Sequence, residues 1–329
     1  MTNLQAIKGR LSTITSFIDT SRRFLYVDYP LHTNVGDLLI NLGSEQFFSE
    51  QGLHIWRRYN YYDFPRHIPG ICQDDVFLLH GGGNLGDMWF NFQSFRESIL
   101  ERYPQNQVIF LPQTVLFLSR EREAASVRKM AAHRKLHVFA RDYVSLDRLQ
   151  RAGLSCVSAA PDMAHSLAGV IKPIGSEARE PSLRLTRRDL EESRPPSELI
   201  AGGQPSVDWD EGVFPISRQI IHRVVVNTVK GVGRYGPALD LHRLWYWHRD
   251  KMISDGIALF SGYRSIVTNR LHAMLLGVLL GRKVTAWDNN YGKLSSYYDA
   301  WLSDLPGLTF HRKPYEASER ECAQFAAGD

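Results

Sequence analysis

The chain has 329 residues, of which 43% are hydrophobic and 22% charged, and its 39 basic and 35 acidic residues give a formal net charge of +4. This composition is that of a globular protein, and the length suits two domains better than one core. The weak positive charge, without a dense block of lysine and arginine, argues against a nucleic-acid-binding protein.

The N-terminal segment lacks the apolar core of a signal peptide. A membrane span would need a run of about 18 apolar residues, and the sequence has no such run. Apolar residues recur there at helical spacing, with basic residues nearby: Leu4, Ile7, Leu11, Ile14 and Ile18. We expect this stripe to pack on its own domain, with a helix lying on a membrane surface as the alternative.

The three cysteines are Cys72, Cys156 and Cys322. They are far apart and form no C-x-x-C pair or zinc-binding spacing. We therefore expect free thiols in a reducing cytoplasm, and no metal site.

Short apolar runs and amphipathic segments alternate through the first half of the chain. The apolar runs predict strands over residues 24–29, 53–58, 75–80, 107–112 and 135–140. The segments between them predict helices over residues 37–52, 90–103, 120–134 and 141–153. This alternation predicts an α/β fold with a parallel sheet covered by helices on both faces, in which ligands bind beyond the carboxyl ends of the strands.

The composition changes near Lys172, where a polar stretch rich in Pro, Ser, Glu and Arg runs to about Gly212. We interpret it as the passage between two domains, residues 1–172 and 173–329, with a strand leading to a helix inside residues 181–193. Beyond this stretch the pattern predicts strands over residues 222–229, 263–269 and 282–287, and helices over residues 238–260 and 271–281.

The sequence HGGGNLGD follows a predicted strand directly. Asn84 can hydrogen-bond a sugar or a carboxylate, and Asp87 can bind a hydroxyl or act as a base. In the alternative, this is a tight turn and Asp87 caps the next helix. The motif contains three consecutive glycines, Gly81, Gly82 and Gly83. Consecutive glycines let the backbone approach a ligand closely and aim its N–H groups at an anion.

The same N-x-G-D pattern follows the first predicted strand, as Asn34, Gly36 and Asp37. Taken alone, Asp37 could equally cap the helix that begins there. Because the pattern occurs twice, each time after a strand, we predict that both loops line one cleft. Their Asn and Asp side chains would then hold hydroxyl groups.

A third candidate lies where the predicted strand over residues 263–269 ends at Asn269. Arg270 and His272 follow, at the start of an apolar helix whose N-terminus favours anions. Arg270 could clamp a phosphate or carboxylate, and His272 titrates near neutral pH and could transfer a proton. In the alternative, Arg270 is a solvated residue and His272 packs against a strand.

These pieces together resemble one family, the polysaccharide pyruvyl transferases that decorate bacterial exopolysaccharides such as succinoglycan. The matching motifs follow the family's order from about Tyr26 to Trp301: NVGD, HGGGNLGD, RDYVSLDRL, an aspartate at Asp162, TRRDLE and VTNRLHAMLLG. Residues 207–262 carry no matching signature.

The resemblance implies two Rossmann-like domains that face each other across a cleft, as in GT-B glycosyltransferases, with a terminal helix that can cross back. It implies phosphoenolpyruvate as donor, no further cofactor, and a product in which pyruvate forms a ketal across two hydroxyls of one sugar. The acceptor is then a sugar or a lipid-linked oligosaccharide, and in the second case the enzyme would work at the inner face of the membrane.

The resemblance also implies residue roles. Arg270 and Arg187, with Arg188 beside it, would bind the phosphate and the carboxylate of the donor. His272 would be the general acid, and Asp37 or Asp87 would accept a hydroxyl proton or orient the acceptor. Two alternatives stay open: a GT-B glycosyltransferase that uses a nucleotide sugar, and a non-catalytic sugar-binding component of an assembly complex.

Overall fold

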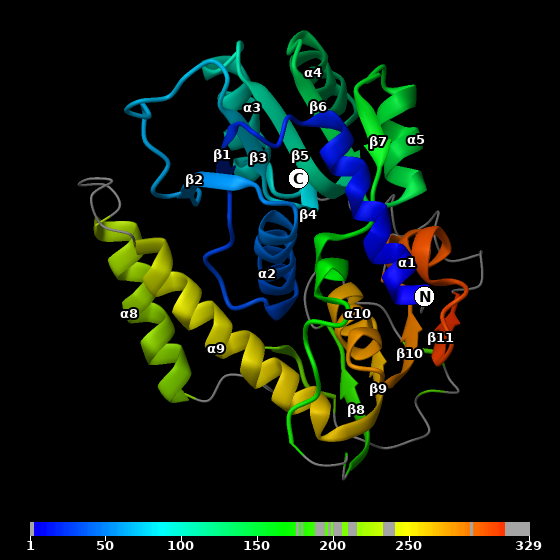
Figure 1. The fold of residues 1–329 in the computed structure, drawn as a ribbon. Helices are drawn as coiled ribbons and strands as arrows, with labels where there is room; N and C mark the ends of the chain where they lie inside the picture. Colours follow the sequence, from blue (N-terminus) through cyan, green and yellow to red (C-terminus); the bar gives the residue numbers. More distant parts are fainter. Residues whose placement is uncertain are drawn as a thin grey trace.

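The fold contains two parallel β-sheets with helices packed around and between them (Figure 1). The structure is a computed structural model that describes residues 3–175, 178, 180–187, 195, 196, 199, 206–209, 216–232, 241–289 and 292–312. The predicted α/β class with parallel sheets is confirmed.

The first sheet has seven strands, in the order β2-β1-β3-β5-β6-β7 with β4 paired to β5. The strands are β1 (Arg23–Val27), β2 (His54–Tyr59), β3 (Val76–Leu79), β4 (Gly82–Gly86), β5 (Gln107–Leu116), β6 (Leu136–Ala140) and β7 (Val157–Ala159). The helices that connect them are α2 (Val35–Glu50), α3 (Phe90–Arg102), α4 (Arg120–Ala132) and α5 (Tyr143–Arg151).

The second sheet has four strands in the order β11-β10-β9-β8. They are β8 (Glu180–Leu185), β9 (Tyr263–Thr268), β10 (Lys283–Trp287) and β11 (Leu308–His311). Its helices are α8 (Ile216–Val232), α9 (Leu241–Ser261), α10 (Leu271–Leu279) and α11 (Lys293–Tyr297), followed by a π-helical turn, η3 (Tyr298–Leu302). Three short segments are also described: α1 (Asn3–Gly9), η1 (Arg10–Phe17) and η2 (Met163–Leu167).

Successive residues of a strand face opposite sides of the sheet, and here they enter two hydrophobic clusters. Leu25 and Val27 of β1 belong to a cluster that includes side chains of α3, α4 and α5. Phe24 and Tyr26 belong to the other cluster, which continues through α2 and η2 into the second sheet and α10. One continuous core therefore joins the two sheets, and α2 lies inside it.

The predicted division into domains at residues 172 and 173 falls between β7 and β8, the last strand of the first sheet and the first strand of the second. Independent folding of the two parts stays a prediction, as does the closer likeness to GT-B enzymes. The terminal helix expected to cross back lies outside the described residues.

One secondary-structure prediction was wrong: residues 222–229 belong to helix α8 and do not form a strand. Val225 and Val229, four residues apart, are buried, whereas Val224 is 61% exposed, which is the spacing of a helix packed on one side. His222 packs edge-on against Trp245 of α9. β-branched residues disfavour a helix by only a few tenths of a kcal/mol each, so packing against α9 decides the conformation.

The glycine-rich sequence after β3 does not form the tight turn considered as the alternative, because residues 82–86 form β4. β5 has ten residues and extends beyond the end of β3, which has four. β4 pairs with the outer part of β5, from Gln113 to Leu116, and so satisfies backbone groups that β3 does not reach.

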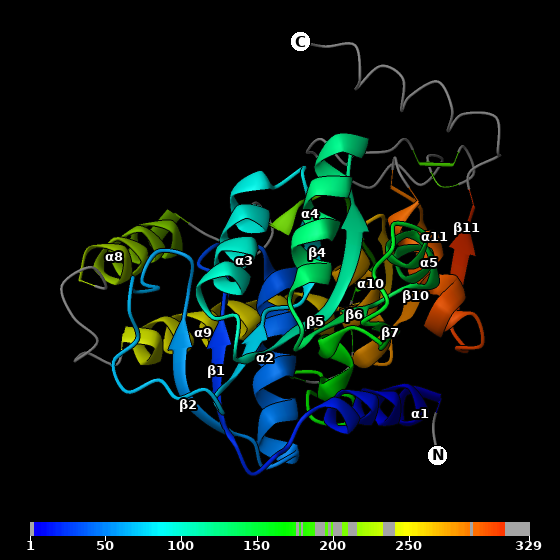
Figure 2. The same cartoon turned by 90° about the horizontal axis from the view of Figure 1, so that it is seen from above.

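The N-terminal apolar stripe packs on its own fold, as expected. Ile7, Leu11 and Ile14 are buried, and Leu4 and Ile18 contact the same core. Lys8 forms an ion pair with Glu50 at the end of α2. This excludes the alternative of a membrane-surface helix for these side chains. Figure 2 shows α1 and α8 at opposite sides of the molecule.

Two further expectations concern the part of the chain that the structure describes. Cys72 and Cys156 are free thiols there, and Cys322 lies outside it. No described helix has the length and apolar character needed to cross a bilayer.

Replacement of a buried side chain tests the docking of the N-terminal segment. We expect Ile14→Ala to lower the free energy of unfolding by about 2–5 kcal/mol, because it leaves a cavity in a packed core. The exposed control Ser16→Ala should stay within about 0.5 kcal/mol of the parent chain. Urea unfolding measures both, and an unchanged midpoint for Ile14→Ala would show that the segment does not dock.

Candidate active site

A cavity of about 420 Å³ opens at the carboxyl ends of the strands of both sheets. Pockets that hold small molecules commonly measure ~300–1,000 Å³. The wall from the first half of the chain is lined by Asp28, Pro30, His32, Thr33, Asn34, Asp37, His80, Gly81, Gly83, Asn84, Trp89 and Phe92. The wall from the second half is lined by Arg187, Trp209, Arg270, Leu271, His272 and Lys293.

The first N-x-G-D motif forms the N-terminus of α2. Asn34 is the N-cap residue, because its Oδ1 accepts a hydrogen bond from the N–H of Gly36 at 3.0 Å. Its Nδ2 donates to Oδ2 of Asp37 at 3.0 Å. Asp37 is therefore not the cap, and its carboxylate is on the cavity wall.

Asp37 lies among positively charged or protonatable groups. Burial disfavours its charged form, but the neighbouring His32, His272, His80 and Lys293 outweigh burial and lower the pKa of Asp37. The carboxylate is consequently ionised at neutral pH.

Gly36 lets α10 approach α2 closely. A Cβ atom built on Gly36 would lie 2.8 Å from Nδ1 and 2.9 Å from Cβ of His272. Any larger residue would displace the imidazole. The glycine of this motif therefore makes room for a histidine from the other half of the chain.

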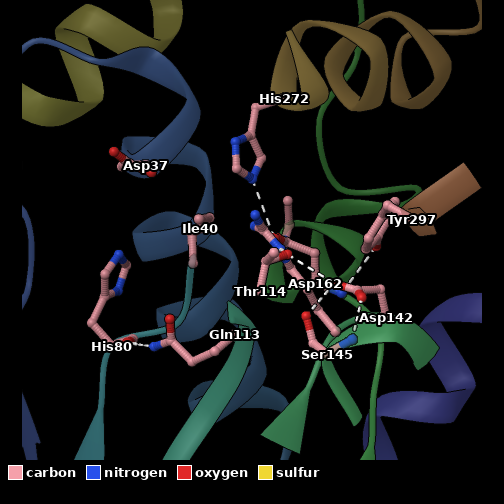
Figure 3. A network of polar contacts seen from close by, with 12 residues as sticks. Asp37, Ile40, His80, Gln113, Thr114, Asp142, Ser145, Asp162, His272 and Tyr297 are labelled. Carbon is pink, nitrogen blue, oxygen red and sulfur yellow. Dashed lines mark hydrogen bonds and ion pairs between the residues drawn. The ribbon is translucent and has the colours of Figure 1, made fainter. Parts of the chain in front are cut away.

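His272 is held from the opposite side by Asp162 (Figure 3). Its Nε2 lies 3.2 Å from Oδ2 of Asp162, a fully buried residue that caps η2. A carboxylate on one ring nitrogen fixes the orientation of an imidazole. Figure 3 shows the imidazole between Asp162 and Asp37.

Asp162 carries a second ion pair, with Nη1 of Arg141 at 2.7 Å, and both side chains are fully buried. Burial disfavours the charged carboxyl, but His272 and Arg141 more than compensate, so the pKa of Asp162 lies well below its usual range. The backbone N–H of Asp162 donates to the hydroxyl of Tyr297 at 3.0 Å. Asp162 thus joins the end of the first sheet to α10 through its carboxylate and to α11 through its backbone.

Gly83 has a similar role for a lysine. A Cβ atom on Gly83 would lie 2.5 Å from Nζ of Lys293, the first residue of α11, and 3.0 Å from Nη2 of Arg141. Without a side chain at this position, the buried lysine reaches from the second half of the chain to the glycine-rich segment.

On the wall from the second half of the chain, Asn269 lies between the segments that carry Arg187 and Arg270. Its Oδ1 accepts a hydrogen bond from the backbone N–H of Arg187 at 2.8 Å, which ties the segment after β8 to the end of β9. Arg270 follows, and its Nη2 pairs with Oδ2 of Asp208. Its carbonyl accepts the first intrahelical bond of α10, from the N–H of Met274.

His80 lines the cavity from the end of β3. Its Nδ1 is 2.6 Å from the hydroxyl of Tyr26, and Nε2 is buried with no hydrogen-bond partner among the described residues. Burial lowers the pKa of His80 to about 3, so the ring is neutral under ordinary conditions.

Asp87 does not line the cavity. Its two carboxylate oxygens accept hydrogen bonds from the N–H groups of Leu118 and Ser119, at 2.6 and 2.9 Å. These bonds anchor the end of β4 to the segment that leads into α4. The structure gives Asp87 a structural role, its predicted catalytic role stays a prediction, and it does not cap α3, whose N-cap is Trp89.

Comparison with known proteins now identifies the chain. The family described as polysaccharide pyruvyl transferase matches residues 34–291. The chain belongs to this family. The match covers both N-x-G-D motifs, Asp162 and the Arg270–His272 segment.

Named relatives agree with this assignment. The chain is 31% identical over 96% of its length to "Putative pyruvyl transferase EpsO" of Bacillus subtilis, of which it covers 96%. It is 22% identical over 85% of its length to "Pyruvyl transferase 1" of Schizosaccharomyces pombe, of which it covers 70%. A crystal structure of an uncharacterized protein from Klebsiella pneumoniae has the same fold, with a TM-score of 0.61 and 20% identity over 94% of this chain and 99% of that one.

Most of the site residues that the sequence predicts for this pyruvyl transferase family member lie at the cavity described above. Those that line it are Asn34, Asp37, Gly81, Gly83, Asn84, Arg187, Arg270 and His272. Gly36 and Asn269 instead support its walls from behind, Gly82 begins β4, and Arg188 lies outside the described residues.

Sequence reasoning missed several lining residues. Asp28 and His80 each follow directly on a strand, the same signal that pointed to Asn269 and the glycines, and could have been found by it. His32, Trp209 and Lys293 carry no such signal, because they reach the cavity through packing of distant segments. No described group of His, Cys, Asp or Glu side chains could hold a metal ion, and the expectation that none is needed stays a prediction.

A methyl group at position 36 tests the contact between the two helices. We expect Gly36→Ala to cost about 1–3 kcal/mol of unfolding free energy and to change the NMR shifts of the His272 imidazole, because the added atom overlaps the ring. In the control Gly9→Ala, the added atom meets nothing within 4 Å, and helical Ala is favoured over Gly. If Gly36→Ala matched that control in both unfolding free energy and imidazole NMR shifts, Gly36 would not lie against His272 as described.

The ion pairs of Asp162 predict a pH dependence of stability. Its pKa is lower in the folded than in the unfolded chain, so its contribution is complete above the unfolded value of ~3.9 and is lost as the pH falls below it. Asp162→Asn should therefore cost about 3–5 kcal/mol at pH 7, and the difference from the parent chain should shrink below about pH 4.

Urea unfolding at a series of pH values measures this difference. The exposed pair of Arg22 with Asp74 provides the control, and Asp74→Asn should cost less than about 1 kcal/mol at any pH. A cost for Asp162→Asn that stays constant from pH 7 to pH 3 would contradict the assignment.

Proposed function

We propose that the chain transfers the pyruvate group of phosphoenolpyruvate onto two hydroxyls of one sugar, as a ketal, in a bacterial exopolysaccharide or its lipid-linked precursor. Membership of the pyruvyl transferase family supports the transferred group. The observation that carries the donor assignment is that Arg187, Arg270 and His272 lie together on one wall of the cavity.

The charges of this wall suit the donor. Phosphoenolpyruvate carries a phosphate and a carboxylate, and arginine forms bidentate hydrogen bonds with both kinds of group. The N-terminus of α10 adds the positive end of a helix dipole at the same wall. Asp208 holds the guanidinium of Arg270 at the cavity surface, where an anionic donor would meet it.

The pair of His272 with Asp162 suits the first chemical step. Transfer requires a proton on C3 of the donor, which turns the methylene into a methyl group and makes C2 electrophilic. His272, protonated and held through Nε2 by Asp162, would supply that proton from its other ring nitrogen. The first sugar hydroxyl bonds to C2, phosphate leaves, and the second hydroxyl closes the ring. Of the two hydroxyl protons, one balances the proton given to C3 and the other leaves with phosphate.

No metal or organic cofactor takes part in this scheme, since arginine side chains and a helix N-terminus can neutralise the departing phosphate. We further propose that the protein acts in the cytoplasm, at the inner face of the membrane where its acceptor is lipid-linked, and that it binds no nucleic acid. Free thiols at Cys72 and Cys156 support a reducing compartment.

Ligand-dependent thermal unfolding with two variants tests the proposal. Phosphoenolpyruvate should stabilise the parent chain, by about 2.7 kcal/mol at one hundred times its Kd. Arg270→Gln should abolish that stabilisation. His272→Gln should keep it but lower pyruvate incorporation by about 10²–10⁴-fold, because only the proton donor is lost. The acceptor in the activity assay is polysaccharide or membrane fraction from a strain that lacks this chain.

The controls separate the alternatives. Arg151→Gln, at a highly exposed arginine on α5, should behave as the parent chain in both assays. Stabilisation by nucleotide sugars alone would instead support a glycosyltransferase. Full incorporation by both Arg270→Gln and His272→Gln would leave a non-catalytic sugar-binding role.

A further inference from the structure

Asp28 is an unusual residue on the cavity wall. It follows β1 directly, is 4% exposed and has φ +69°, the one positive φ of a non-glycine residue in the described part of the chain. Its N–H donates to the carbonyl of Tyr59 at 2.9 Å, which fixes this backbone. Aspartate tolerates the left-handed region better than most residues, but glycine and asparagine adopt it more readily. Such strained positions are concentrated at functional sites.

Arg96 of α3 holds Asp28 and Asn84 together. Its guanidinium is fully buried, and Nη2 donates to Oδ2 of Asp28 at 2.8 Å and to Oδ1 of Asn84 at 2.7 Å. Its Nη1 donates to the carbonyl of Asn84 at 3.0 Å. One arginine therefore fixes two cavity-lining side chains, from the ends of β1 and from β4.

The polar atoms of Asp28 and Asn84 that Arg96 does not bind are suited to hydrogen bonds with hydroxyl groups. Oδ1 of Asp28 has no hydrogen-bond partner among the described residues, and an ionised carboxylate oxygen only accepts hydrogen bonds. Because Oδ1 of Asn84 is bound to Arg96, the amide nitrogen of Asn84 is the group free to donate to a ligand. An acceptor and a donor side by side match two neighbouring hydroxyls of a sugar.

The surroundings favour a neutral ligand at this place. The charge of Asp28 is balanced by Arg96, and a carboxylate here would repel an anionic donor. Trp89 and Phe92 line the cavity nearby, and Trp89 is about half exposed, so an aromatic face is available to the apolar side of a sugar ring.

From this geometry we infer that Asp28 and Asn84, positioned by Arg96, form the acceptor subsite, and that Asp28 accepts the proton of the attacking hydroxyl. This inference rests on the proposed function. In the step, the hydroxyl oxygen bonds to C2 of the donor, its O–H bond breaks, the proton moves to Oδ1 of Asp28 and finally leaves with phosphate.

The electrostatics of the two aspartates agree with this assignment. Burial raises the pKa of Asp28 to about 6, even though Arg96 opposes the shift, which makes it a better proton acceptor near neutral pH than an ordinary carboxylate. Asp37, whose pKa is lowered by the histidines around it, is a weaker base. Asp37 is therefore not the proton acceptor in this scheme.

Asp28→Asn is the decisive variant, because asparagine has the same shape and also tolerates positive φ. We expect it to keep the stabilisation by phosphoenolpyruvate and to lower pyruvate incorporation at least 100-fold, with polysaccharide or membrane fraction from a strain lacking this chain as acceptor. Asp28→Gly, which also removes the backbone strain, should show the same loss. The matched control is Asp75→Asn, which removes the partly buried ion pair of Arg23 with Asp75 at the opposite end of the same sheet and should keep incorporation.

The outcomes separate the inference from the proposed function. Incorporation by Asp28→Asn within tenfold of the parent chain would overturn the inference and leave the proposed function standing. If neither Asp28 variant folds while Asp75→Asn does, the aspartate is structural and the inference is also wrong. A parent chain that neither binds phosphoenolpyruvate nor transfers pyruvate would overturn the proposed function itself.

Discussion

The buried carboxylate of Asp162 is the interaction on which the rest of the site depends. The carboxylate forms an ion pair with Arg141, after the end of β6, and also contacts His272 of α10. The backbone N–H of Asp162 donates a hydrogen bond to the hydroxyl of Tyr297 on α11. A buried charge is costly unless it is paired, so this carboxylate requires partners from both halves of the chain. The relative position of the two sheets is thereby linked to the orientation of the imidazole.

Around this pair, the two halves of the chain supply different chemistry. The second half contributes the basic side chains Arg270, His272 and Lys293, at the starts of α10 and α11. The first half contributes acceptors and amides: Asp28 after β1, Asn34 at the start of α2 and Asn84 in β4. In the proposed reaction, the anionic donor and the neutral acceptor meet opposite walls, and the reacting atoms lie where the walls face each other.

Much of this could be predicted from the sequence, because strand ends and glycine-rich loops have local signals. The α/β class, most strands, and the convergence of Asn34, Asn84, Arg270 and His272 on one cavity follow from such signals. The packing role of Gly36 and Gly83 could not be predicted from such local signals. The sequence suggests backbone access for a ligand, whereas Gly36 and Gly83 make room for His272 and Lys293, which are more than 200 residues away along the chain.

The errors have a common physical cause, which is tertiary context. The valines of α8 prefer strands locally but pack as a helix against α9. Asp87 has the spacing of a helix cap or a base, yet two distant backbone N–H groups use both its oxygens. Asp28 was overlooked since the features behind its inferred role are not local: it is positioned by Arg96, 68 residues later, and its pKa is raised by burial.

The contacts at Gly36 and Gly83 also restrict how such a protein can diverge. A side chain at either position would overlap a functional group contributed by the other half of the chain. Position 36 can therefore change only together with position 272, since the overlap there includes Cβ of His272, whereas at position 83 the overlap falls on the flexible end of Lys293, which can shift. The cavity can be remodelled gradually at the aromatic residues of its wall, but a change at position 36 requires a matching change at position 272, so sequence covariation between the two halves should be concentrated at this pair.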